Sequence, residues 1–433
     1  MPVFAYVILL NTQSEFLGNA ITAVGLIIFA AHLFTALFDR TKLPDVLPLI
    51  LIGIVLGPVF NILTIEDFGY IGPLLSAIAL ILMLFEGGSH LKIETLKSSL
   101  KDCVILSIST FLITMLTTTL FTKYLIGIPL IPALFTGAVL GSISPAVVVP
   151  IIRTLKLTEK TKSTLVIESA ITDVLSIIIA LGILKTFETG NKTIIEFIGT
   201  NLIATMIMSL LVGFGGSIIW STILEKIRKF PNTIFTSLAF IFILYGLSEI
   251  LGYSGPISVL IFGLVLANSK KVPISIVKRF GTDHITEFTN IEKTLFSEVI
   301  FLVKTFFFIY LGISIQFSDV KILITGLLLT LIIYFGRLLL SRLIIPKATP
   351  IYEAAMMSFV IPKGLAAAVL AEVPIHMNLT YQNLNIFTEI RAIIYMVILF
   401  SILITAILIY TQEAGITRSK FEKLFSHFNK NEF

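Results

Sequence analysis

The sequence predicts an all-α integral membrane protein that crosses a lipid bilayer many times. Of its 433 residues, 56% are hydrophobic and only 13% are charged, and the mean hydropathy is +1.01. Soluble domains are about 45–50% apolar and about 25% charged. The apolar runs are continuous over the roughly 20 residues that a spanning helix needs, and they do not alternate as the strands of a membrane barrel do.

Apolar runs of this kind recur along the whole chain and are separated by short polar loops. Counting them predicts about thirteen transmembrane helices. Their approximate limits are 18–38, 46–63, 71–87, 103–122, 129–152, 164–187, 195–224, 236–251, 254–269, 298–315, 320–341, 351–374 and 386–410.

The basic residues of the loops predict the orientation of these spans. With the N-terminus outside, the outer loops carry only Lys123, Lys185, Lys192 and Lys321, and the other basic loop residues lie inside. An excess of Lys and Arg on the inner side is the usual orientation signal. We therefore expect a multi-pass plasma-membrane protein with a transmembrane domain over 1–414 and a short basic cytoplasmic tail over 415–433. Because this bias explains the net charge of +5, we expect no nucleic-acid partner.

Two predicted spans, 129–152 and 351–374, contain helix-breaking residues, among them Pro145 and Pro362. Proline removes a backbone donor, and in hydrocarbon the freed groups must be satisfied by protein, water or ions. Interrupted helices at corresponding positions of two halves are typical of transporter binding sites. The two spans are seven apart, which predicts two inverted six-helix repeats joined by a linker span, with crossed, interrupted helices.

The span 164–187 carries two acids near its centre, Glu168 and Asp173. A charge at the centre of a spanning helix costs roughly 2.5–3.5 kcal/mol on insertion scales, so such residues mark ion pathways by default. Ser169 lies one turn before Asp173 and offers a second oxygen ligand on the same face. We favour an ion-binding role for Asp173 over a buried acid satisfied by hydrogen bonds between helices. For Glu168, a structural and a functional role are both open.

Four further charged residues lie within or at the ends of spans. Arg337 cannot lose its charge and needs a partner when buried, for which Glu168 is the leading candidate. Lys363 is interpreted as offsetting the negative end of a half-helix, in preference to a lysine in a water-filled funnel. Lys304 is either a counter-charge near the site or a lysine that snorkels to the surface. Glu86 either draws cations into an inner funnel or is a solvated acid at a helix end.

Several motifs, taken in order, resemble those of the monovalent cation:proton antiporters, the sodium/proton exchanger superfamily, over nearly the full length of the chain. The motifs are LFEGG at 84–88, SISPAVVVP at 142–150, ESAITD at 168–173, SGPISVLIFGLVLAN at 254–268, KTFFFIYLGISI at 304–315 and IPKGLAAAVLAE at 361–372. The resemblance implies the fold of that superfamily and a homodimer.

The resemblance also implies the roles of individual residues. Asp173 matches the acid that binds cation and proton in turn, and Ser169 matches the hydroxyl ligand of a site for Na⁺. Glu168 and Arg337 match a structural ion pair beside this site. Ser144 falls at the crossing of the interrupted helices, where family members supply oxygen ligands.

Two positions depart from the family pattern. Thr172 replaces the asparagine of many electroneutral members and the aspartate of electrogenic ones. Since threonine does not ionise, a single titrating acid favours one-for-one exchange, with Thr172 as a further oxygen ligand. Ser144 replaces an aspartate of many exchangers, which leaves the positive ends of the half-helices without an obvious acid.

The expected function is antiport of a monovalent cation, Na⁺ or Li⁺, against H⁺, without a cofactor. A K⁺/H⁺ antiporter of the same fold is the alternative. From other classes, a cation channel or a sodium-coupled organic-anion symporter remains open. An enzyme is not expected, because the sequence contains no nucleophile–base set and no metal-binding motif.

Overall fold

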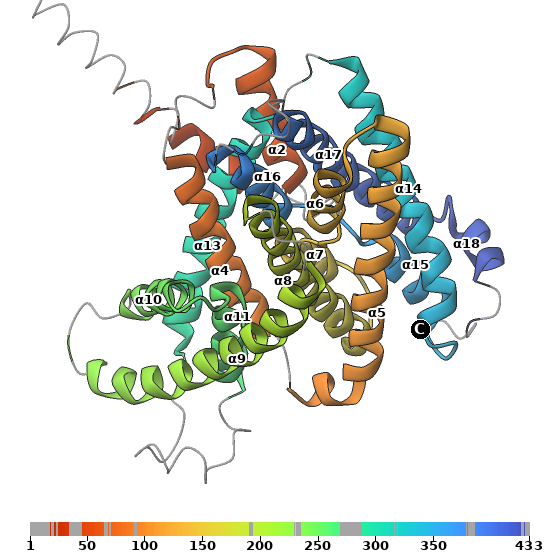
Figure 1. Ribbon diagram of the computed structural model, residues 1–433. Coiled ribbons are helices and arrows are strands. Elements are labelled where there is room, and N and C mark those ends of the chain that lie inside the picture. Colours follow the sequence, from red (N-terminus) through yellow and green to blue (C-terminus); the bar gives the residue numbers. More distant parts are fainter. Residues whose placement is uncertain are drawn as a thin grey trace, which may run out of the picture.

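The regular elements of the protein are helices throughout the part of the chain that the computed structural model describes (Figure 1). The described residues are 18, 21–22, 25–33, 46–64, 68, 71–90, 93–189, 194–228, 230, 235–268, 288–315, 317, 319–377, 379, 386–425 and 428. Most of the stretch 270–297, between the predicted spans 254–269 and 298–315, and part of the first predicted span lie outside them.

The helices follow one another with short connections. Their bounds are α2 (Val46–Ile54), the π-helix η1 (Val55–Val59), α4 (Ile71–His90), α5 (Ile93–Phe121), the π-helix η2 (Thr122–Ile126), α6 (Leu130–Leu140), α7 (Pro145–Thr154), α8 (Glu159–Thr189), α9 (Ile194–Ile227), α10 (Thr236–Ile250), α11 (Gly255–Ala267), α13 (Asn290–Ile313), α14 (Val320–Ile344), α15 (Ile351–Phe359), α16 (Leu365–His376), α17 (Ile386–Glu413) and α18 (Arg418–Leu424).

Each predicted span from 46–63 onward contains at least one of these helices. Within the described residues, six helices are long and apolar enough to cross a membrane: Lys101–Ile126, Glu159–Leu184, Ile207–Leu224, Asn290–Ile313, Val320–Ile344 and Ile386–Glu413. Apart from 71–87, which contains the 20-residue helix α4, the other predicted spans from 46–63 onward contain helices of at most 15 residues. The count of thirteen spans and the inverted repeats stay predictions.

Two helices begin well before their predicted spans. The helix α5 begins at Ile93, ten residues before the predicted start at 103, and α13 begins at Asn290 instead of 298. The start of α13 is fixed by a capping box, in which Thr289 and Glu292 satisfy each other's backbone N–H groups. Hydropathy marks only the apolar part of a helix, so it does not detect these polar first turns.

The helices pack in two groups that meet along α4 and between α8 and α9. In one group, α4 packs against α11 and α13, α2 against α13, and α9 against α11. In the other, α5 packs against α6, α8 and α14, and α14 against α17. Contacts of α4 with α7 and α16 join the groups, and Figure 1 shows α6, α7, α8 and α16 in the middle of the molecule. The interrupted helices therefore lie in the interior.

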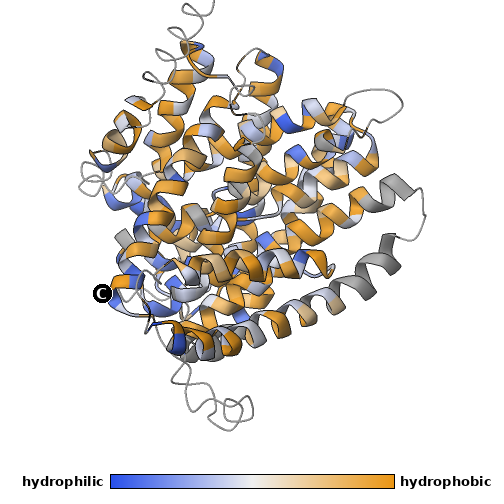
Figure 2. Ribbon diagram, turned by 90° about the vertical axis from the view of Figure 1, so that its left-hand side faces the viewer, coloured by the Kyte–Doolittle hydropathy of each residue, from blue (hydrophilic) through white to orange (hydrophobic). Residues whose placement is uncertain are grey.

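The outward face of α14 is apolar. Leu328, Leu331, Phe335 and Leu339 recur at helical spacing, and each exposes close to half or more of its surface. Figure 2 shows that apolar residues extend along most of the helices. A continuous apolar face of this kind is unfavourable in water and favourable against lipid tails.

Because α4 and α11 approach each other closely, we expect alanine substitutions at two neighbouring glycines to have different effects on stability. A Cβ atom on Gly88 would overlap the carbonyl oxygen of Leu260, whereas a Cβ on Gly87 would meet nothing within 4 Å. We expect Gly88→Ala to destabilise the protein by about 1–3 kcal/mol because the backbones must move apart. Gly87→Ala is the matched control and is expected to be neutral or stabilising by up to about 1 kcal/mol. Thermal unfolding in detergent measures both, and equal melting temperatures for the two variants would contradict this packing.

The helix α18 lies within the predicted tail 415–433 and packs against α15 and α17. The Phe421 ring is 5.3 Å from the ring of Phe359, the last residue of α15, and Phe425 is fully buried. This part of the tail is therefore docked onto the helical body. The division of the chain at residue 414 stays a prediction.

Candidate functional site

The two interrupted spans cross at their breaks. The first break separates α6 from α7 at residues 141–144, and the second separates α15 from α16 at residues 360–364. The backbone N–H of Ser144 donates to the carbonyl oxygen of Pro362 at 2.9 Å. A Cβ on Gly364 would overlap the Ser144 side chain, so glycine permits this approach. The two extended segments are thus joined in the interior of the molecule.

Side chains from two other helices satisfy backbone groups that the breaks expose. At the first break, the N–H of Ile143 donates to the Thr172 hydroxyl of α8 at 3.1 Å. At the second, the N–H of Lys363 donates to the Ser401 hydroxyl of α17 at 2.9 Å. The Thr405 hydroxyl donates to the carbonyl oxygen of Phe359 at 3.3 Å. Both breaks are therefore held by hydroxyl groups, as backbone in an apolar interior requires.

The ammonium group of Lys363 extends from the second break to the first. Its Nζ donates to the carbonyl oxygen of Ser142 at 2.8 Å, just beyond the C-terminal end of α6. The lysine is 1% exposed. A positive charge at this place opposes the negative end of the half-helix.

Asp173 lies on α8 beside these breaks. It follows Thr172, which binds the first break, and its helix packs against α16, which begins at the second break. The residue is 2% exposed, and its Oδ1 atom is buried without a hydrogen-bond partner. The Ser144 hydroxyl at the crossing is likewise buried and unpartnered. A buried carboxylate oxygen without a partner is costly, and a cation or a proton would relieve that cost.

The hydroxyl groups of Ser169 and Thr172 are engaged with the α8 backbone. The Ser169 hydroxyl donates to the carbonyl oxygen of Val166 at 2.8 Å, and that of Thr172 donates to the carbonyl oxygen of Glu168 at 2.9 Å. The Thr172 hydroxyl also accepts a hydrogen bond from the Ile143 N–H, and this bond joins α8 to the first break. Each oxygen retains a lone pair that can be offered to a cation.

Glu168 and Arg337 form an ion pair that is 1% and 0% exposed. One guanidinium nitrogen lies 2.8 Å from Glu168 Oε2, and the other donates to Oε1 and to the Thr110 hydroxyl. Arg337 also donates to the carbonyl oxygen of Met357 at 2.7 Å. This bidentate pair connects α5, α8, α14 and α15 around the crossing. Sequence reasoning missed Thr110 and Ser401, which stand out only as hydroxyl groups within apolar helices.

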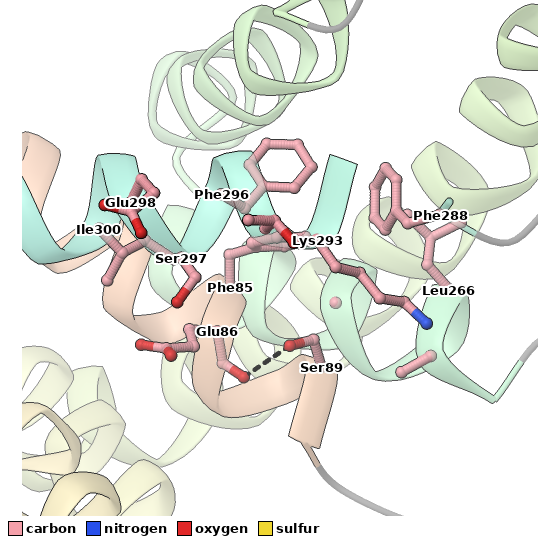
Figure 3. A pocket seen from close by; sticks show the side chains of 13 residues that line it. Phe85, Glu86, Ser89, Leu266, Phe288, Lys293, Phe296, Ser297, Glu298 and Ile300 are labelled. Atoms are coloured by element: carbon pink, nitrogen blue, oxygen red, sulfur yellow. Dashed lines mark hydrogen bonds between the residues drawn. The ribbon is translucent and has the colours of Figure 1, made fainter. Parts of the chain in front are cut away.

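The remaining predicted charges lie on helices of the other group. Lys304 is half-buried on α13, with its Nζ 5.9 Å from the centre of the Phe301 ring. Glu86 is half-buried on α4 and lines a cavity of about 570 Å³ between α4, α11 and α13. Lys293 and Glu298 line the same cavity (Figure 3). The residues 141–144 and 360–364 of the crossing do not line this cavity.

Comparison with known proteins identifies the family. Residues 27–410 match the sequence model of the family described as "Sodium/hydrogen exchanger, transmembrane". The chain is 27% identical over 349 residues to Na(+)/H(+) antiporter 1 of Methanocaldococcus jannaschii, covering 75% of this chain and 74% of that protein. It is 24% identical over 256 residues to the K(+)/H(+) antiporter NhaP2 of Shewanella oneidensis, covering 58% of this chain and 43% of that protein.

A solved structure has a similar fold. The sodium proton antiporter MjNhaP1 from Methanocaldococcus jannaschii, determined at pH 8, superimposes with a TM-score of 0.67 at 24% identity. The match covers 90% of this chain and 99% of that one. With the family model matching most of the sequence, the chain belongs to the sodium/hydrogen exchanger family.

Proposed function

We propose that this protein is a secondary antiporter that exchanges Na⁺ for H⁺ across the membrane, with Asp173 carrying either ion. The observation that carries the proposal is the buried Asp173 carboxylate, whose Oδ1 lacks a partner beside two crossed helix breaks. Two relatives of the protein are named as a Na⁺/H⁺ antiporter and a probable Na⁺/H⁺ antiporter, which favours Na⁺ as the cation. The transported ions are substrates, and no cofactor is required.

The coupling follows from the cost of moving a bare charge through a barrier of low dielectric constant. When protonated, Asp173 is neutral. When deprotonated, it binds Na⁺ with oxygen atoms of Ser169, Thr172 and Ser144. An empty carboxylate is unfavourable in the interior, so the site changes sides only when it holds a proton or a cation. Opposing fluxes are thereby coupled without ATP.

The stoichiometry we propose is one cation for one proton. Thr172 does not ionise, and the charge of Glu168 is balanced by Arg337 in a buried ion pair, so Asp173 is the one acid here without a charge partner in hydrogen-bond contact. The exchange is then electroneutral.

We also propose that the chain comprises two inverted six-helix repeats within about thirteen spans. Each break between two half-helices is contacted by a hydroxyl of the helix that follows. Thr172 of α8 contacts the break between α6 and α7, and Ser401 of α17 contacts the break between α15 and α16. Equivalent contacts of this kind are expected if α8 and α17 occupy corresponding positions in the two repeats. Alternating access would then arise from one bundle rocking against the other.

The proposed setting is the plasma membrane, with the N-terminus outside and the C-terminus cytoplasmic, as the distribution of basic residues predicts. Glu86 would face the cytoplasm and attract cations. We further propose a homodimer through helices outside the ion-carrying bundle. Large apolar side chains on α9 and α10, including Leu211 and Leu247, are exposed and suit such a contact.

The test is proton movement in sealed proteoliposomes with a pH-sensitive dye inside. Na⁺ and Li⁺ are expected to dissipate an imposed pH gradient, at a rate independent of a clamped voltage. A response to K⁺ alone would favour the K⁺/H⁺ alternative that the NhaP2 relatives suggest. Na⁺ flux without proton movement would indicate a channel, and dependence on an organic anion would indicate a symporter.

A further inference from the structure

Glu353 is a buried acid for which the exchange mechanism above has no role. It lies in the first turn of α15 and is 1% exposed. The same helix ends at Phe359 and leads directly into the second break, which carries Lys363. Whatever holds Glu353 therefore sets the position of one of the two crossing segments.

The Glu353 carboxylate receives three hydrogen bonds from the beginning of α8. The Thr158 N–H donates to Oε1 at 2.7 Å, and the hydroxyl groups of Thr158 and Thr161 donate to Oε2 at 2.9 and 2.5 Å. Thr158 immediately precedes α8, so the acid also lies at the positive end of that helix. Hydrogen bonds that a carboxylate accepts are charge-assisted and stronger than those between neutral groups.

The contact joins two elements that meet again at the ion site. Met357, one turn beyond Glu353 on α15, accepts two hydrogen bonds from Arg337, which pairs with Glu168 of α8. Two buried contacts thus fix α15 along α8, one at the start of both helices and one at the ion pair. Without Glu353, the start of α15 would lose these three hydrogen bonds to the start of α8.

We propose that Glu353 is a positioning residue for ion exchange: it fixes α15 against α8, so that the second break and Lys363 are held beside Asp173. This inference rests on the proposed function, because Asp173 must carry the exchanged ions. Since Lys363 donates to Ser142 at the first break and α16 packs against α8, a displaced α15 alters the charge and the shape of the site. The apparent KM for Na⁺ is the quantity that reports this change.

Loss of Glu353 is expected to be tolerated by the fold. A cavity of about 260 Å³ adjoins the contact and is lined by Glu353, Thr158, Thr161 and Thr349. The lining is partly apolar but includes Asp102 and Lys160, so water that enters the cavity has polar partners and can bond to the donors that the substitution frees. The variants should therefore fold, and their transport can be measured.

The experiment compares Glu353→Ala, Glu353→Gln and the double variant Thr158→Val/Thr161→Val in proteoliposomes, over a range of Na⁺ concentrations. Glu353→Ala is expected to raise the apparent KM for Na⁺ by about fivefold or more, the lower limit of typical coupling between sites. Glu353→Gln keeps an acceptor oxygen and should have a smaller effect. The double threonine variant should reproduce the defect, and combining it with Glu353→Ala should add little.

Thr349→Val is the matched control, because Thr349 lines the same cavity without a hydrogen bond to the Glu353 carboxylate. It should keep the wild-type KM. An unchanged KM in Glu353→Ala, with only a lower melting temperature or a lower maximal rate, would overturn the positioning role. So would additive effects of the glutamate and threonine substitutions. If the wild-type protein itself moves no protons in response to Na⁺, the proposed function fails and this inference fails with it.

Discussion

Replacing Asp173 with asparagine is expected to reduce Na⁺-driven proton movement to the level of protein-free vesicles. The amide neither releases a proton nor supplies the negative charge that holds a cation in the interior. Folding should persist and the melting temperature should not fall, because the wild-type carboxylate has a buried oxygen without a partner. The measurement is dye fluorescence in proteoliposomes, with thermal unfolding of the same preparation.

The control for this variant is Asp102→Asn, the same chemical change at an exposed residue of α5. It should exchange ions at the wild-type rate. Sustained Na⁺-dependent proton flux through Asp173→Asn would refute the assignment of Asp173 as the ion carrier.

Replacing Arg337 with methionine is expected to destabilise the protein by about 3–5 kcal/mol. The substitution leaves the Glu168 carboxylate buried without its charge partner, and an uncompensated buried charge costs about this much. Two hydrogen bonds to the Met357 carbonyl group are lost as well. Thermal or denaturant unfolding in detergent gives the change in stability.

A second substitution separates charge from packing. Adding Glu168→Gln to Arg337→Met removes the unpaired charge and should recover part of the lost stability. Arg342→Met is the control, because Arg342 lies on the same helix and is exposed. A wild-type melting temperature for Arg337→Met would show that the ion pair contributes nothing to the fold.

The helix breaks and the charges around them could be predicted from the sequence because each violates a strong physical rule. Pro145 and Pro362 interrupt apolar runs, and Glu168 and Arg337 are charged residues inside them. Within hydrocarbon, a charged side chain requires a partner of opposite charge, and the apolar spans contain few such side chains. The scarcity of buried charges therefore limits Arg337 to very few possible partners, and Glu168 is the one that it contacts.

Other parts of the site could not be predicted in this way. Thr110, Ser401 and Thr405 are ordinary residues for a membrane helix, and only the packing of distant helices shows that they bind Arg337 or the breaks. Likewise, Glu353 looks like a solvated acid at the start of a span, since its partners Thr158 and Thr161 are almost two hundred residues away.

The crossed segments 141–144 and 360–364 are bonded to each other and to two flanking helices. A binding place built in this way is preorganised, so little conformational entropy is lost when it fills. If the proposed cation site lies here, an incoming cation exchanges its hydration shell for oxygens whose spacing is already set. Discrimination between ions then depends on how well ionic radius matches that spacing, and release can be fast because nothing has to unfold.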